Sequence, residues 1–217
     1  MSGWERLSTG VEAWRAPARG SRKANLVLIQ EIFGVNANIR ALADRFAGEG
    51  FEVLAPSYYD RVSPRFEAGY DDAGVAKGRA ATAATAWDTV AADTDAAIAA
   101  LGGPAYVAGF CWGGAAAWIA AARCTGVLGA AGFYGRLIVD LLAEAPKAPI
   151  ILHYGVRDPI IPPEDVAKVR AAYPGMAVHT YAAGHGFFSD RGHDHDPAEA
   201  DLAWARTLAF WGISSRG

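Results

Sequence analysis

The amino-acid sequence predicts an α/β protein with a mostly parallel central sheet and helices on both of its faces. Short apolar runs of strand length alternate with longer segments whose apolar residues recur at helical spacing. Because helices separate successive strands, we expect the strands to run parallel and to be covered on both faces. The chain has 217 residues, of which 52% are hydrophobic and 20% charged, and it suits a single domain spanning residues 1–217.

The predicted elements alternate through most of the chain. The first helix has Asn36 as a suitable N-cap and Gly50 as a stop signal. The last helix follows Asp196 and Pro197, a pair typical of a helix start. The predicted strands are residues 26–30, 51–56, 104–110, 127–135, 148–155 and 176–182, and the predicted helices are residues 36–50, 85–103, 115–123, 162–173 and 197–212.

One segment, residues 57–80, breaks this alternation. It is polar, contains glycine and has no helical or strand period. Irregular segments of this length in compact domains often serve as lids or substrate walls. We therefore expect an irregular insertion near 57–80 that forms one wall of a substrate site.

Composition and charge exclude several classes of partner. A net charge of −3 and a pI near 5.9 provide no basic surface for nucleic acid. The apolar runs are shorter than the roughly 20 residues of a membrane span, and the N-terminus lacks the apolar core of a signal peptide. The two cysteines, Cys111 and Cys124, do not form a disulfide framework, so we expect a cytoplasmic protein. No membrane or nucleic-acid partner is expected, and the chain is expected to be a monomer or a weak oligomer.

The sequence GFCWGG, residues 109–114, lies between a predicted strand and a predicted helix. This setting is typical of the nucleophile elbow G-x-S-x-G, where a sharp turn exposes a catalytic serine. Here the serine position is Cys111, and the N-terminus of the following helix favours its thiolate form. The backbone amide of Trp112 points the same way and could stabilise an oxyanion. The alternative is a buried core cysteine, the most common location of that residue.

Two further segments supply partners for a nucleophilic thiol. A thiol needs a base to accept its proton, and the base needs an acid that fixes its tautomer. Asp158 and His185 each follow a predicted strand, and loops at the carboxyl ends of strands line the ligand crevice of open α/β sheets. Taken singly, Asp158 also suits a turn and His185 a surface loop. The order nucleophile, acid, histidine is that of the α/β-hydrolase triad, which predicts this fold.

Four motifs together resemble the dienelactone hydrolase family, the cysteine-using branch of the α/β-hydrolase fold. The resemblance implies a Cys-His-Asp triad in which Cys111 is the nucleophile, His185 the base and Asp158 the orienting acid. It also implies hydrolysis of small lactones or esters through an acyl-enzyme, without a cofactor or a metal. The motifs, which span most of the chain, are QEIFGVN (30–36), GFCWGG (109–114), GVRDPIIP (155–162) and AGHGFF (183–188).

The same resemblance implies the remaining site residues. Glu31 is expected to be a further active-site carboxylate, and the backbone N–H groups of Ile32 and Trp112 are expected to form the oxyanion hole. In the family's proposed scheme the carboxylate helps to withdraw the thiol's proton when an anionic substrate arrives, and a neutral resting thiol resists oxidation. The alternative for Glu31 is a salt bridge at a strand end.

The sequence departs from the family's pattern on the substrate side. Well-known members have an arginine four residues after the histidine, whereas that position here is Ser189, and Arg191 lies two residues further on. Arg79, in the insertion, is a second candidate for binding a substrate carboxylate, because arginine's planar fork matches that group. Tyr134 either lines the site or packs in the core. A related lactone or ester is therefore as well supported as dienelactone itself.

Two alternatives to a thiol hydrolase remain open. Residues 193–196, His-Asp-His-Asp, could belong to a metal-dependent hydrolase, because histidine and aspartate bind zinc. Four such side chains in succession cannot all converge on one ion, and a solvated loop that caps the last helix is a simpler interpretation. The second alternative is a non-catalytic ligand-binding protein on the same scaffold. The complete triad argues against it, since a binding protein needs no nucleophile.

Overall fold

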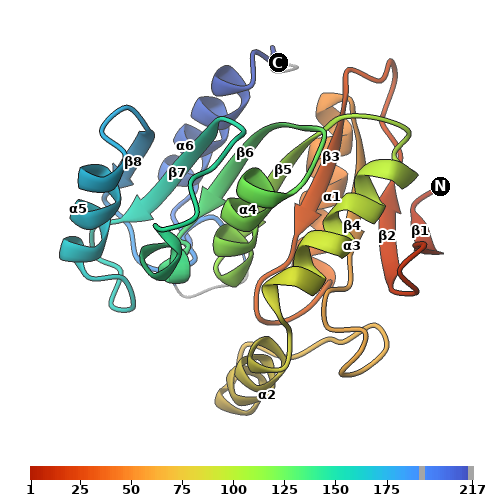
Figure 1. Cartoon of the computed structure of the whole chain (residues 1–217), viewed down its shortest axis with the longest axis horizontal. Coiled ribbons are helices and arrows are strands. Elements are labelled where there is room, and N and C mark those ends of the chain that lie inside the picture. The colour runs from red at the N-terminus through yellow and green to blue at the C-terminus, as the bar shows by residue number, and fades with distance from the viewer. Residues whose placement is uncertain (191–193, 215–217) are drawn as a thin grey trace.

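An eight-stranded sheet forms the centre of the computed structural model, which describes residues 1–190 and 194–214 (Figure 1). Its strands are β1 (Gly3–Arg6), β2 (Glu12–Ala16), β3 (Ala24–Ile29), β4 (Phe51–Pro56), β5 (Ala105–Phe110), β6 (Val127–Phe133), β7 (Ile150–Gly155) and β8 (Ala177–Tyr181). They lie in the order β1-β2-β4-β3-β5-β6-β7-β8. Neighbours from β4 to β8 run parallel, whereas β1 and β2 are antiparallel to each other and β2 is antiparallel to β4. The prediction of a mostly parallel sheet is confirmed.

Helices cover both faces of this sheet (Figure 1). α1 and α6 lie on one face, where Phe46 of α1 packs against Trp204 of α6 at 4.4 Å between ring centroids. α3 and α4 pack together on the opposite face, where a 3-10 helix, η1, packs against both α4 and α5. The helices are α1 (Ala37–Glu49), α2 (Asp72–Ala83), α3 (Trp87–Ala100), α4 (Trp112–Arg123), η1 (Arg136–Leu141), α5 (Pro163–Ala172) and α6 (Pro197–Phe210).

The predicted helix boundaries agree with local capping chemistry. The side chain of Asn36 accepts hydrogen bonds from the amides of Asn38 and Ile39 at 3.1 and 3.2 Å, and Gly50 ends α1 with φ of 98°. Asp196 accepts from the amide of Glu199 at 3.2 Å and begins α6. Side-chain and backbone preferences therefore set these ends directly.

Two elements at the edge of the sheet were not predicted. β1 and β2 are only four and five residues long and are mostly half-buried, so they lack the continuous apolar run that marks the central strands. They extend the sheet beyond β4 with antiparallel pairing and leave the parallel part unchanged.

The segment 57–80 is not wholly irregular, which corrects the prediction made for it. Its second half enters α2, a helix whose buried face consists of Gly74, Gly78 and Ala81. Because these residues are small, the helix has no large apolar residues whose spacing would reveal it. A Cβ atom at Gly78 would lie 2.4 Å from the carbonyl oxygen of Ile32, so α2 rests directly on backbone.

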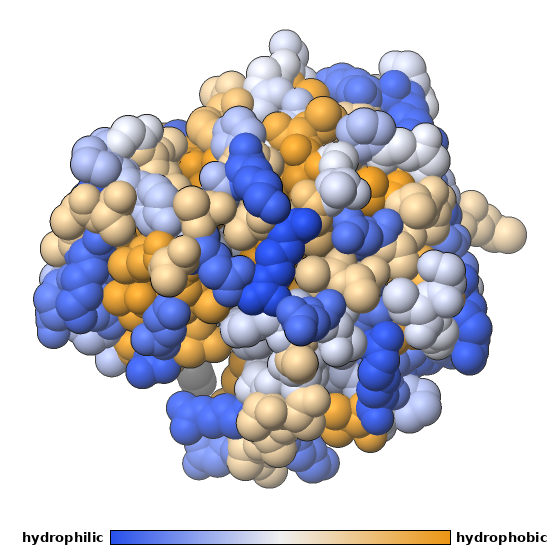
Figure 2. Space-filling model, in the orientation of Figure 1, coloured by the Kyte–Doolittle hydropathy of each residue, from blue (hydrophilic) through white to orange (hydrophobic). Residues whose placement is uncertain are grey.

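The surface mixes polar and apolar side chains. On the face in Figure 2, hydrophilic residues are interspersed with smaller apolar areas, and the surface is indented between α2 at the lower edge and the rest of the molecule. Within the described ranges, no helix combines the length and the apolar character needed to cross a membrane.

Candidate active site

Cys111 occupies a strained turn between β5 and α4. Its backbone has φ of 56° and ψ of −118°, and its amide donates to the carbonyl of Phe133 at 2.9 Å. A positive φ is uncommon for a residue with a side chain and requires support from its surroundings. The turn is closed tightly, since a Cβ atom at Gly109 would lie 1.8 Å from the carbonyl oxygen of Gly113. This is the geometry expected of a nucleophile elbow.

Gly113 brings the elbow against the end of β3. A Cβ atom at this position would lie 2.4 Å from the carbonyl oxygen of Gln30 and 2.8 Å from that of Ile29. Glycine therefore allows the first turn of α4 to lie against the chain that leads into Glu31 and Ile32. Residues about 80 positions apart in the sequence meet here, and Ile32 and Trp112 line the same cleft as Cys111.

The structure brings Cys111, His185 and Asp158 into one hydrogen-bonded chain. His185 Nε2 lies 3.3 Å from Cys111 Sγ, and His185 Nδ1 lies 2.7 Å from Asp158 Oδ2. The other carboxylate oxygen of Asp158 accepts from the amides of Ile160 and Ile161 at 2.8 and 3.2 Å. Both oxygens of the Asp158 carboxylate are therefore held by hydrogen bonds. The oxygen that faces His185 keeps a proton on Nδ1 of the imidazole.

The surroundings of His185 favour its charged form. Burial disfavours the imidazolium, but the hydrogen bonds to Asp158 and Cys111 outweigh this effect and raise the pKa of His185 to about 10. An imidazolium at neutral pH places its Nε2 proton toward the sulfur. A cation in this position stabilises negative charge that develops on a neighbouring sulfur.

Glu31 lies beside this chain in a buried polar environment. Glu31 is 4% exposed, and its Oε2 accepts a hydrogen bond from the hydroxyl of Tyr70 at 3.4 Å. Burial raises the pKa of Glu31, opposed by the charge of His185 and by the bond from Tyr70. The hydroxyl of Tyr70 also accepts from Asn36 Nδ2 at 3.2 Å. Within the described ranges, Glu31 has no ion pair with arginine or lysine and no hydrogen bond to Cys111.

An open cleft of about 510 Å³ leads to the sulfur. Arg79 enters it from α2, and Arg136 enters it from η1. Both arginines are exposed, and neither forms an ion pair with another residue that the structure describes. The cleft is lined by Ile32, Arg79, Thr82, Cys111, Trp112, Arg136, Leu137, Ile160 and His185.

Sequence reasoning identified Arg79 as a candidate but missed Arg136. The available signal was its position, because Arg136 follows the carboxyl end of β6 after two residues and loops at those ends face the ligand crevice. Ser189 is buried, and its hydroxyl has no hydrogen-bond partner in the described part of the chain. The other arginine candidate, Arg191, lies outside the described residues.

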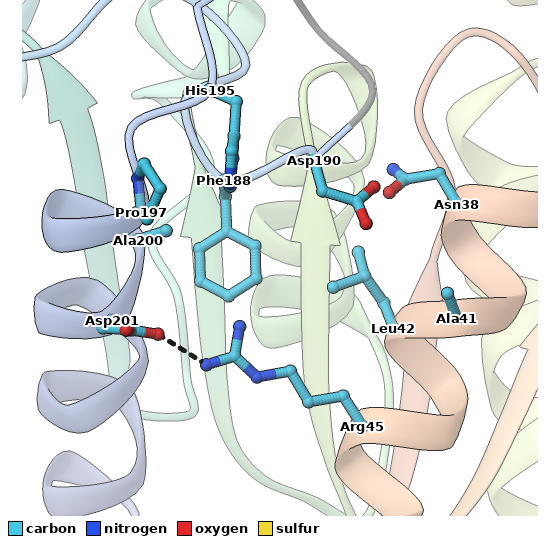
Figure 3. A pocket seen from close by; sticks show the side chains of 10 residues that line it. All are labelled: Asn38, Ala41, Leu42, Arg45, Phe188, Asp190, His195, Pro197, Ala200 and Asp201. Carbon is cyan, nitrogen blue, oxygen red and sulfur yellow. Dashed lines mark hydrogen bonds and ion pairs between the residues drawn. The ribbon is translucent and has the colours of Figure 1, made fainter.

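Of the residues considered for a metal, His195 lines a cavity separate from this cleft. His195 and Asp190 line a second cavity of about 230 Å³ between α1 and α6 (Figure 3). Arg45 crosses that cavity, forms an ion pair with Asp201 at 2.9 Å and stacks on Trp204 at 4.2 Å.

The His-Asp-His-Asp segment is only partly described. His193 lies outside the described residues, and Asp196 caps α6. No group of three or more metal-capable side chains is found among residues 1–190 and 194–214.

Comparison with known proteins agrees with this architecture. The model of the dienelactone hydrolase family matches residues 11–214. The chain is 33% identical over 208 residues to a carboxymethylenebutenolidase from Pseudomonas sp. strain P51, covering 88% of this chain and 85% of that protein. It is 32% identical over 203 residues to a candidate carboxymethylenebutenolidase from Synechocystis, covering 83% and 82%.

A solved structure extends the agreement to three dimensions. A candidate dienelactone hydrolase from Klebsiella pneumoniae superposes with a TM-score of 0.87 at 26% identity, and 99% of each chain is covered. The predicted fold class, the resemblance and the predicted class of enzyme, a hydrolase, are thereby confirmed. The chain belongs to the dienelactone hydrolase family.

Proposed function

We propose that the protein is a cysteine-dependent hydrolase of small esters or lactones that works through an acyl-enzyme. The observation that carries this proposal is the hydrogen-bonded chain from Asp158 through His185 to Cys111 at the base of an open cleft. Cys111 is the proposed nucleophile, His185 the proposed acid and base, and Asp158 the group that orients the imidazole. No cofactor is required by these steps, and the thiol's need for a reducing environment fits the predicted cytoplasmic location.

The acylation step begins with a thiolate beside an imidazolium. The sulfur of Cys111 attacks the carbonyl carbon of the substrate, and the carbonyl oxygen becomes an oxyanion. The amides of Ile32 and Trp112 are proposed to donate to that oxyanion, since both residues flank the sulfur in the cleft. When the tetrahedral species collapses, the carbon–oxygen bond breaks and the leaving oxygen takes the Nε2 proton of His185. In a lactone the leaving oxygen remains attached to the acyl group.

Deacylation reverses the roles with water as the nucleophile. Neutral His185 removes a proton from a water molecule while the water oxygen attacks the thioester carbon. Collapse then breaks the carbon–sulfur bond, releases the acid and restores the thiolate–imidazolium pair. A stable thiolate leaves readily, so a thiol suits substrates whose own leaving oxygen is also a weak base, such as an enol.

Glu31 is proposed as a further active-site carboxylate. Its burial next to His185 places a titratable group behind the reacting atoms. Because it makes no direct hydrogen bond to Cys111 in the described structure, proton transfer between the two would require one side chain to move. The resting proton acceptor that contacts the sulfur is His185.

The substrate is proposed to carry a negatively charged group. Arg79 and Arg136 enter the cleft from separate elements without ion-pair partners in the described ranges, so their charges are available to a ligand. Thr82 of α2 lines the same side as Arg79. α2 would then form the substrate wall predicted for the insertion.

The decisive experiment compares the two cysteines. Cys111→Ala is expected to lower turnover of an activated ester by at least about a thousandfold, as removal of a nucleophile does, while circular dichroism stays unchanged. Cys124→Ala is the matched control, because Cys124 is a free buried thiol bonded to the carbonyl of Ala91. Retained activity in Cys111→Ala would disprove the thiol mechanism, and loss of wild-type activity on chelation would favour the metal alternative.

A further inference from the structure

Tyr134 stands at the end of β6 in a backbone conformation that a bulky residue rarely adopts. Its φ is 40°, in the left-handed region, and its amide donates to the carbonyl of His153 at 2.7 Å. Such strain is costly and persists only where neighbouring contacts hold the residue in place. Here those contacts leave the side chain 1% exposed.

The ring of Tyr134 packs on the imidazole of the proposed triad. Its centroid lies 5.1 Å from that of His185, with 62° between the ring planes. It also packs against Phe187, at 5.7 Å between ring centroids and 67° between the ring planes. These edge-to-face contacts are a favourable arrangement for aromatic rings. They restrict the directions in which the imidazole can tilt away from Cys111.

The hydroxyl of Tyr134 is buried and makes no hydrogen bond of ordinary geometry in the described part of the chain, yet it lies close enough to Glu31 to interact with that carboxyl. Burial raises the pKa of Tyr134, and the neighbouring charges of Glu31 and Cys111 add to the rise. An unpaired buried hydroxyl is costly, and a nearby carboxylate is its natural acceptor. The hydrogen bond that Glu31 receives from Tyr70 is long, at 3.4 Å.

Resting on the thiol mechanism proposed above, we propose that Tyr134 is a positioning residue with two contacts. Its ring holds the His185 imidazole in line with Cys111, and its hydroxyl donates a hydrogen bond to Glu31 when that carboxyl is ionised. The phenol keeps its proton throughout. The strained backbone is the means by which one side chain, leaving from the end of β6, reaches both groups.

The groups that face Glu31 determine what a titration would report. They are His185 from the loop after β8, Tyr70 from the segment before α2, Asn38 from α1 and Tyr134 from the end of β6. Among them only His185 carries positive charge. Removing the hydroxyl of Tyr134 takes a donor from the ionised carboxylate, so the pKa of Glu31 should rise.

The test measures kcat and KM for an activated ester, and the alkylation rate of Cys111 by iodoacetamide, across pH. The part of the pH profile that reports the ionisation of Glu31 is identified by its absence in Glu31→Gln. In Tyr134→Phe, the apparent pKa of that part is expected to rise by about one unit, the size of one hydrogen bond to a charged group. The Tyr134→Phe, Glu31→Gln double variant should have the same pH profile as Glu31→Gln alone, because the hydroxyl then has no carboxylate to donate to. Tyr154→Phe, at a buried tyrosine of β7 outside the cleft, should match the wild type.

The ring contact is tested separately. Tyr134→Leu is expected to lower kcat about tenfold or more relative to Tyr134→Phe with little change in KM, because a misdirected base slows chemistry rather than binding. Additive effects of Tyr134→Phe and Glu31→Gln, or no limb sensitive to Glu31→Gln, would overturn the hydroxyl contact. Equal kcat in the Leu and Phe variants would overturn the ring contact. Neither result would affect the thiol mechanism, which fails only if Cys111→Ala remains active.

Discussion

α4 and α2 both border the cleft that contains Cys111, but they are held in very different ways. α4 begins directly after Cys111 and is buried from Trp112 to Ala122. α2 buries only three small residues and stands at the lower edge of the molecule (Figure 1). The proposed nucleophile is thus carried by one of the most enclosed helices, whereas Arg79 is carried by a peripheral one. In the proposed mechanism, the reacting atoms are thus fixed by the core, whereas the proposed substrate contacts come from the edge of the molecule.

Adding a methyl group at an equally tight position in each helix tests this difference most directly. A Cβ atom at Gly113 or at Gly78 would lie 2.4 Å from a carbonyl oxygen in each case. Because α4 cannot shift within the core, Gly113→Ala is expected to lower the free energy of unfolding by about 3 kcal/mol and to abolish activity. Because α2 can move outward, Gly78→Ala is expected to cost about 1 kcal/mol.

Urea unfolding followed by circular dichroism measures both costs. Gly48→Ala in α1 is the control, because a Cβ there meets nothing within 4 Å. Equal destabilisation by Gly113→Ala and Gly78→Ala would show that α2 is held as rigidly as α4.

Substitution of Arg79 and Arg136 tests whether the edge of the cleft binds a charged substrate. Arg79→Ala and Arg136→Ala are each expected to raise KM about fivefold for an ester that carries a free carboxylate, the size of one partly exposed charge contact. KM for the matching neutral ester should not change. Lys77→Ala, on the exposed surface of α2, is the control. An equal effect on both esters would remove the anionic substrate from the proposal.

The smallest expected effect is on stability as a function of pH. The pKa of His185 is raised in the folded protein to about 10, so its contribution is fully present below its ordinary value near 6.5 and is lost as the pH rises toward 10. The free energy of unfolding of the wild type relative to His185→Gln is therefore expected to be larger at pH 6 than at pH 7.5, by about 1 kcal/mol. A difference that grows with pH would contradict the charged imidazole.

The sequence predicted most of the fold because the decisive signals are local. Asn36, Gly50 and Asp196 mark helix ends through their own side chains or backbone freedom. The central strands are continuous apolar runs, and the motif GFCWGG identifies the turn that carries Cys111. Family and class of enzyme followed from motifs that span the chain, and comparison with relatives confirmed both.

What the sequence did not predict depends on packing between distant segments. α2 was missed because its buried face is made of glycine and alanine rather than of large apolar residues. Tyr70 reaches Glu31 only through the course of the insertion, and Arg136 reaches the cleft only through the short helix after β6. The triad residues themselves were predicted, but the distances between Cys111, His185 and Asp158 depend on three loops meeting in the folded chain.

The left-handed backbone at Cys111 has a consequence for the choice of element at that position. The conformation is imposed by the close approach of Gly109 and Gly113 to neighbouring main chain, not by the sulfur. A serine at position 111 would adopt the same backbone angles, since it differs from cysteine only in the atom attached to Cβ. The backbone conformation therefore does not distinguish oxygen from sulfur at this position. In the thiol mechanism proposed above, the selection of sulfur therefore follows from its reactivity toward the substrate rather than from the backbone geometry.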